Sequence, residues 1–110
     1  MSADSFVVFF GVRHQLSEEE FDACERKQHP WMILARQGGF HHYWGNFYED
    51  CDRYILLIGH RIGVFGKEGL TEVVISPEEF ARINKDVTAK LRSAGIEQAP
   101  SLHCLYEPDF

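Results

Sequence analysis

Phe6-Val7-Val8-Phe9-Phe10-Gly11-Val12 is the stretch that decides the fold. Apart from Gly11, its residues are β-branched or aromatic, and they are apolar at odd and even positions alike. Successive side chains of a strand point to opposite faces of a sheet, so such a run is stable where both faces are covered. The stretch therefore predicts a central β-strand.

Two helical segments are predicted around this strand, and the first is broken. Ser17-Glu18-Glu19-Glu20 is a capping box, in which a hydroxyl and a carboxylate each satisfy a backbone N–H of the first turn. Pro30 interrupts this helix because it disfavours a helical residue before it, and a second piece runs to Gly38-Gly39. Ser76-Pro77-Glu78-Glu79 starts a long helix whose apolar residues recur every three or four positions.

The remaining apolar segments predict short strands joined by turns. Gly59-His60-Arg61 is expected to form a tight turn between two of them. The further strands are expected over residues 40–48, 54–58, 62–65, 71–75 and 102–106. This order predicts an α+β fold, in which residues 1–110 form a single two-layer domain. Its parts are a mostly antiparallel sheet of about five strands, a broken N-terminal helix and a long helix in the C-terminal half.

Composition places the chain among ordinary globular proteins. Of its 110 residues, 45% are hydrophobic and 25% are charged, values that indicate neither a disordered nor a membrane protein. The formal net charge of −6 opposes nucleic-acid binding. Three cysteines without a C-x-x-C spacing favour a reducing compartment. With no signal peptide or membrane segment predicted, we expect a cytoplasmic protein.

The segment 40–52 stands out for its side-chain chemistry. It combines aromatic rings and imidazoles with an acidic run at its end. Aromatic side chains concentrate at protein interfaces, and acidic groups at a rim steer basic partners. Alternate residues of a strand face opposite ways, so one set of these rings is expected in the core. The predicted partner-binding residues are His42, Tyr43, Trp44, Tyr48, Glu49, Asp50 and Asp52.

These features predict a non-enzymatic, acidic protein-binding module, and the net charge favours a basic protein as its partner. In size, charge and class the chain resembles bacterial toxin-immunity proteins, although it shares no motif with them. A homodimer is also expected, because the strands at 6–12 and 54–58 are apolar on both faces. Two helical segments give little cover for so much apolar sheet.

The alternative hypothesis is a small-molecule binder or an enzyme. Its pocket is predicted from His42, Trp44, Tyr48, His60 and Arg61. In that pocket an imidazole would act as acid or base, and the guanidinium would clamp an anion. No catalytic residue and no cofactor is predicted.

Metal binding is not predicted either, although the chain has six histidines and three cysteines. Adjacent His41 and His42 would point to opposite faces of a strand, and the chain has no H-x-x-x-H or C-x-x-C pattern. Cys51 is flanked by aspartates, whose negative charge disfavours a reactive thiolate. Cys24 and Cys104 are expected in the core as small hydrophobic residues.

Overall fold

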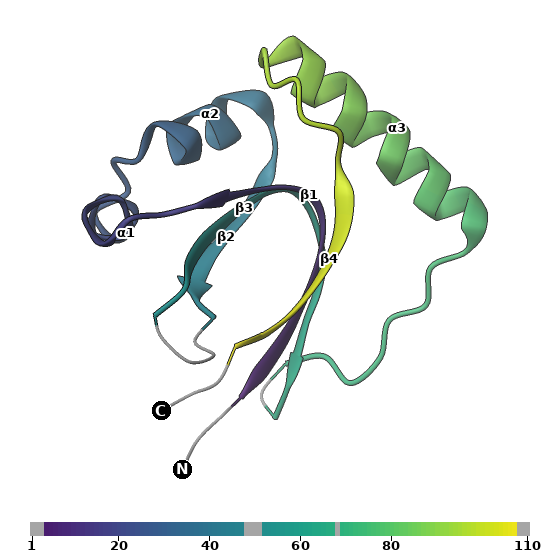
Figure 1. The fold of residues 1–110 in the computed structure, drawn as a ribbon. Coiled ribbons are helices and arrows are strands. Elements are labelled where there is room, and N and C mark those ends of the chain that lie inside the picture. Colours follow the sequence, from purple (N-terminus) through teal and green to yellow (C-terminus); the bar gives the residue numbers. More distant parts are fainter. Residues whose placement is uncertain (1–3, 48–51, 68, 108–110) are drawn as a thin grey trace.

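The computed structural model describes residues 4–47, 52–67 and 69–107, within which it has four strands and three helices. In chain order these are β1 (Ser5–Gln15), α1 (Glu18–Glu25), α2 (Pro30–Gly38), β2 (His41–Asn46), β3 (Tyr54–Gly66), α3 (Pro77–Ser93) and β4 (Ser101–Glu107). Neighbouring strands are antiparallel, and their order across the sheet is β2-β3-β1-β4. This is the ferredoxin-like, or split βαβ, arrangement with its first helix in two pieces (Figure 1). The α+β prediction is confirmed.

The local signals at the helix starts are confirmed as well. At α1, the Ser17 hydroxyl accepts a hydrogen bond from the Glu20 amide at 3.2 Å, and Glu20 Oε1 accepts one from the Ser17 amide at 3.1 Å. At α3, the Ser76 hydroxyl accepts from the Glu79 amide at 3.1 Å. The predicted central strand lies within β1, which pairs with β3 on one side and β4 on the other.

The sheet has four strands instead of about five because two predictions in the middle of the chain were wrong. Residues 59–61 form no turn, since β3 continues through them to Gly66 with an irregularity opposite Val8 and Phe9. Residues 71–75 form no strand; the neighbouring Leu70 makes one isolated bridge to Phe65. Glycine permits a bend within a strand as readily as a turn between strands, and the local pattern does not distinguish them.

A pair of glycines allows the sheet to bend at its centre. Gly11 of β1 is paired with Gly59 of β3, whose φ is +152°. A Cβ atom on Gly11 would lie 2.1 Å from the Ile58 carbonyl oxygen, and one on Gly59 would lie 2.3 Å from that of Phe10. The two backbones therefore approach too closely for any side chain. Both strands curve strongly along their length (Figure 1).

The bend divides the sheet into two arms. β2 pairs with residues 54–59 of β3, whereas β4 pairs with residues 5–11 of β1, so these edge strands lie on opposite sides of the glycine pair. All three helices lie on the outer, convex side of the curve (Figure 1). The broken first helix and the long helix therefore cover the same face of the sheet (Figure 1).

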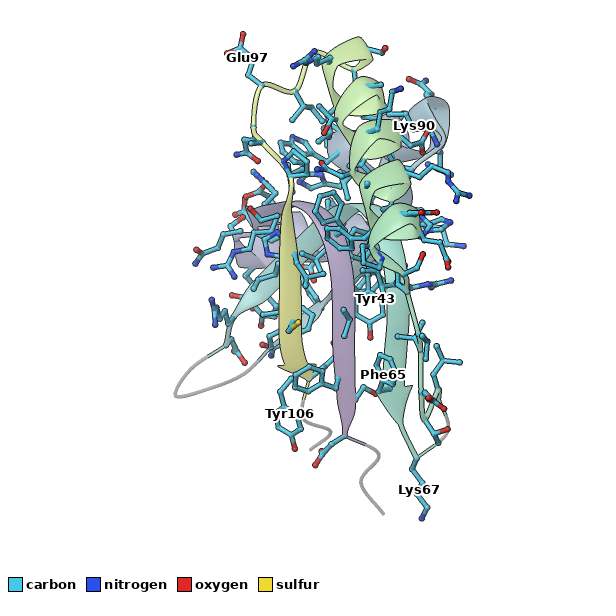
Figure 2. All side chains as sticks on the ribbon, turned by 90° about the vertical axis from the view of Figure 1, so that its right-hand side faces the viewer. Tyr43, Phe65, Lys67, Lys90, Glu97 and Tyr106 are labelled. Carbon is cyan, nitrogen blue, oxygen red and sulfur yellow. The ribbon has the colours of Figure 1, made fainter. Side chains whose placement is uncertain are left out.

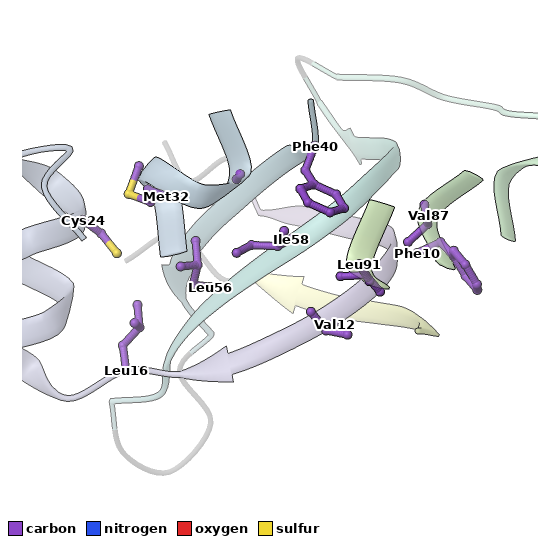
Figure 3. Packing of buried hydrophobic residues seen from close by; sticks show 11 residues of the cluster. Phe10, Val12, Leu16, Cys24, Met32, Phe40, Leu56, Ile58, Val87 and Leu91 are labelled. Carbon is purple, nitrogen blue, oxygen red and sulfur yellow. The ribbon is translucent and has the colours of Figure 1, made fainter. Parts of the chain in front are cut away.

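The main core lies between the convex face and the helices (Figure 3). Its buried members are Phe10, Val12, Leu16, Cys24, Met32, Ala35, Phe40, Leu56, Ile58, Val87 and Leu91. Helices α1 and α2 contribute Cys24 and Met32, while α3 contributes Val87 and Leu91. The apolar positions predicted for the long helix thus include its two buried contacts with the sheet.

The concave face is buried by the sheet itself. A second cluster there consists of Val7, Phe9, Phe47, Ile55 and Leu57, none of them more than 3% exposed. The curvature brings residues of the two edge strands together across this trough. The Tyr43 hydroxyl of β2 donates a hydrogen bond to Glu107 Oε1 of β4 at 2.7 Å. The concave face of β1 is therefore covered without a second layer of helices.

Of the two predictions for cysteines in the core, one is confirmed and the other is wrong. Cys24 is buried, as predicted, but Cys104 is exposed, and its predicted place in the core was wrong. Cys104 lies on an edge strand, in a part of the convex face beyond the reach of the helices. Among the described residues, no helix combines the length and apolar character needed to cross a membrane.

We expect Gly11→Ala to lower the free energy of unfolding by about 3 kcal/mol, at the upper end of the usual cost of overpacking. Gly95→Ala is the control, because Gly95 has a φ of +79° but no atom within 4 Å of an added Cβ. It should lose only the roughly 1–2 kcal/mol of a left-handed residue that is not glycine. Urea denaturation measures both losses. Equal losses would contradict a bend that depends on close backbone contact.

Candidate functional site

The predicted partner-binding residues do not share one face of the sheet. Tyr43 points into the concave trough, where burial, reinforced by its hydrogen bond to Glu107, raises the pKa of its hydroxyl. His42 and Trp44 lie on the convex face, in register with core residues of β3. Burial and the nearby charge of Arg36 lower the pKa of His42. The rings of this segment are thus divided between two environments.

Trp44 is a packing residue. Its ring meets that of Phe21 edge to face, with 5.2 Å between the centroids, and Phe21 in turn lies 4.4 Å from the ring of Tyr54. These three residues come from β2, α1 and β3. The ring of Trp44 therefore holds α1 against the sheet.

The acidic end of the segment is described only in part. Three of its predicted contact residues lie outside the described part of the chain: Tyr48, Glu49 and Asp50. Asp52 accepts a hydrogen bond from Asn46 Nδ2 at 2.8 Å, while Asn46 Oδ1 accepts one from the Arg53 amide at 2.8 Å. These bonds join the end of β2 to the start of β3, so Asp52 stabilises the junction between these two strands.

The alternative ligand pocket is brought together only in part. The rings of His60 and His41 are 5.0 Å apart, and the Arg61 amide donates to His41 Nδ1 at 3.0 Å. Burial, and then the positive charge of these neighbours and of Lys90, lowers the pKa of His41. Trp44 belongs to the packing against α1 and does not line the hollow beside these rings.

That hollow is small, with a volume of about 250 Å³, slightly below the usual range for small-molecule sites. Its one lysine, Lys90, is already engaged, since its Nζ lies 3.1 Å from Asp86 Oδ2 and donates to the Gly39 carbonyl at 3.2 Å. A larger hollow of about 610 Å³ lies between α3 and residues 95–100. Its charged lining residues, Arg92 and Glu97, are both exposed.

A carboxylate between two imidazoles is the feature that the sequence analysis missed. His14, near the end of β1, and His29, just before α2, each place Nε2 at 3.0 Å from Glu20 Oε2. The bonds to His29 and His14, followed by that from the Ser17 amide, lower the pKa of Glu20 to about 2. His29 is only 4% exposed, and the ring of His14 stacks on Trp31 with 4.7 Å between centroids.

Two imidazoles and a carboxylate are suitable ligands for zinc, and their ligand atoms lie within 4.8 Å of one another. The hydrogen bonds, however, leave no lone pair at His29 Nε2. The Trp31 amide donates to His29 Nδ1 at 3.1 Å, so in the neutral ring the proton is on Nε2 and is donated to Glu20. A metal-bound histidine has the reverse arrangement, in which the second nitrogen is a donor. The cluster fits a hydrogen-bonded clamp that joins β1, α1 and α2.

An apolar surface remains on the arm of the sheet that carries β4. Phe6 of β1 is paired with Phe65 of β3 and with Tyr106 of β4, so these three side chains share the convex face. On this arm α3 reaches Phe10, whose ring lies 5.1 Å from that of Phe80. Beyond that contact, none of the three helices lies over the strands (Figure 2).

We name this surface the bare face. It consists of Phe6, Phe65, Leu70, Leu102, Cys104 and Tyr106. Phe6, Leu102 and Tyr106 are 44%, 50% and 51% exposed, respectively. Leu70 belongs to it because its side chain lies over Gly63, which pairs with Val8 on the same face.

Comparisons with known proteins find no similar protein, so the functional proposal rests on this geometry. No family model, no curated protein and no solved structure matches the chain.

We expect Glu20→Gln to lower the free energy of unfolding at neutral pH by about 1–2 kcal/mol, because two imidazole N–H groups lose a charged acceptor. The lower figure allows for the 39% exposure of the side chain. The folded pKa of about 2 lies below the ordinary 4.5, so the stabilisation is complete above pH 4.5 and is lost as the pH falls toward 2.

Urea denaturation at a series of pH values measures the difference between wild type and Glu20→Gln. Glu19→Gln is the matched control, because this exposed neighbour has no hydrogen bond to the imidazoles. The control should stay close to wild type throughout. A wild-type advantage over Glu20→Gln that did not change with pH would contradict the clamp.

Proposed function

We propose that this chain is a non-enzymatic protein-binding domain, and that its contact surface is β4 together with the bare face beside it. The supporting observation is that four large apolar side chains of this surface are each 44–51% exposed to solvent. They are Phe6, Leu70, Leu102 and Tyr106. Monomeric proteins seldom leave contiguous apolar surface in water except where they bind something.

The backbone of β4 provides a second reason. It is an edge strand, and none of the residues Ser101–Glu107 is buried. Edge strands are usually protected by lysine, proline or inward-pointing charge, but β4 contains neither lysine nor proline and only one charge, at Glu107. Such an edge can accept an added strand, whose main-chain hydrogen bonds give affinity while alternate side chains give specificity.

The net charge and an exposed cysteine indicate which partner and which compartment we expect. The net charge of −6 favours a basic protein among heterologous partners, because opposite charges accelerate association at low salt. We place the function in the cytoplasm, where an exposed free thiol such as that of Cys104 stays reduced. Neutralising a basic partner, as in the immunity proteins that the chain resembles in size and charge, is one use of such binding.

A photocrosslinker attached to Cys104 tests the contact surface. Benzophenone maleimide is attached in a Cys51→Ser chain, where the buried Cys24, whose pKa burial raises to about 11, stays unlabelled. Irradiation in a lysate of the native cells should join the label to a discrete protein. Adding Leu102→Lys should lower the yield at least about tenfold, since a charge then replaces an apolar contact.

The control carries the same label at residue 33 of α2 in an Ile33→Cys, Cys51→Ser, Cys104→Ser chain. Ile33 is 40% exposed, similar to the bare face, but it lies on a helix over the other arm of the sheet. A product that forms equally from both positions, or that survives Leu102→Lys, would contradict the proposal. Ligand binding at the hollow beside His41 and His60 would then be the better hypothesis.

A further inference from the structure

The sequence of β4 is symmetric in a way that fits a second copy of itself. Cys104 is the middle residue of the seven, and Pro100 and Pro108 stand four positions before and after it. When two copies of β4 run antiparallel about a two-fold axis at Cys104, every residue from Ser101 to Glu107 has a partner. The ladder then ends at Ser101, because the preceding Pro100 has no N–H to donate.

We propose, on the basis of the protein-binding function above, that the occupant of the β4 edge is a second copy of this chain. The two four-stranded sheets would then form one continuous eight-stranded sheet across a two-fold axis. A two-fold contact uses the same surface on both chains, so that surface must be complementary to itself.

The side chains of β4 meet this requirement. On the convex face, Leu102 lies opposite Tyr106 of the second copy, and this contact occurs twice about the axis. These two residues are 50% and 51% exposed in the single chain, so each has surface to bury. Opposite residues of antiparallel strands have Cα atoms about 4.5–5.5 Å apart, within contact distance for such side chains.

The concave-face pairs are compatible as well. His103 lies opposite Leu105 of the second copy, and Ser101 lies opposite Glu107 of the second copy. Glu107 is the only acidic residue of β4, so no carboxylate of one β4 faces a carboxylate of the other. The pairing therefore avoids like charges opposite one another, which destabilise a sheet.

This register is also favoured over its neighbours. Moving the axis to His103 places Pro100 opposite Tyr106, which puts a residue without N–H inside the ladder. Moving the axis to Leu105 leaves Leu102 without a partner in β4. Either shift also removes the leucine–tyrosine contacts. A shift by one residue would exchange the two faces of the strand.

Charge distinguishes this dimer from a complex with a basic protein. Both copies carry a net charge of −6, so their long-range interaction is repulsive and salt screens it. The dimer should bind more tightly as salt is added, whereas a complex with a basic partner should weaken.

Sedimentation of the purified chain tests the association directly. At tens of micromolar the Cys51→Ser chain should be a dimer, and Leu102→Lys should raise its dissociation constant at least about tenfold. Ile33→Lys, which changes a similarly exposed residue on α2, should leave the dimer intact. Circular dichroism of each variant establishes that it is folded.

Disulfide trapping tests the register. Under oxygen with copper phenanthroline, two Cys104 thiols on the axis should lose two electrons and two protons to form a disulfide between the copies. In a Cys51→Ser, Cys104→Ser background, Leu102→Cys and Tyr106→Cys chains should crosslink when mixed but not separately. Identical positions at 102 are four residues apart along the ladder, about 13 Å, beyond the roughly 7 Å limit for a disulfide.

The outcomes separate the two proposals. A chain that remains monomeric overturns the second-copy inference, while a Leu102-dependent crosslink from Cys104 to a different protein would still support the protein-binding function. A dimer without the mixed 102–106 disulfide overturns the pairing of β4 with β4. A dimer that dissociates as salt is added contradicts association between like-charged chains.

Discussion

The close approach of β1 and β3 at Gly11 and Gly59 is the constraint on which the other features depend. Because no side chain separates the two backbones there, the strands bend, and the edge strands β2 and β4 end on different arms of one curved sheet. The concave face then fills with its own side chains, and Tyr43 bonds to Glu107 across it. The helices are needed only on the convex side, and they cover one arm better than the other. The bare face is the part of the convex side that the helices leave exposed.

Features of the fold that depend on local chemistry were predictable from the sequence. The central strand follows from the apolar run at residues 6–12, and the helix starts follow from Ser17 and Ser76, because each involves residues close together in the chain. The bend at Gly59 was predicted as a turn, since the same residue type suits both and only the partner strand decides. The exposure of Cys104 likewise depends on where α3 ends over the sheet, which no local pattern contains.

The candidate site was harder to predict for the same reason. Aromatic residues at 40–48 have the composition of an interface, yet Trp44 and Tyr43 are used in internal packing on opposite faces. Conversely, Glu20 was identified as a capping residue, but its two imidazole partners come from β1 and from the start of α2, at spacings that follow no helical or strand period. Contact surfaces and side-chain clusters of this kind are properties of the tertiary arrangement.

The pairing of Ser5 with Glu107 has a consequence for the order of folding. These residues are about 100 positions apart, so the β1–β4 ladder closes one of the longest loops in the chain and is expected to form late. Until then β1 is itself an edge strand, with apolar side chains on both faces and an unpaired backbone. On the ribosome, β1 is synthesised about 100 residues before its neighbour β4. Until β4 has emerged, the nascent chain carries a doubly apolar strand with one edge unprotected, which favours aggregation.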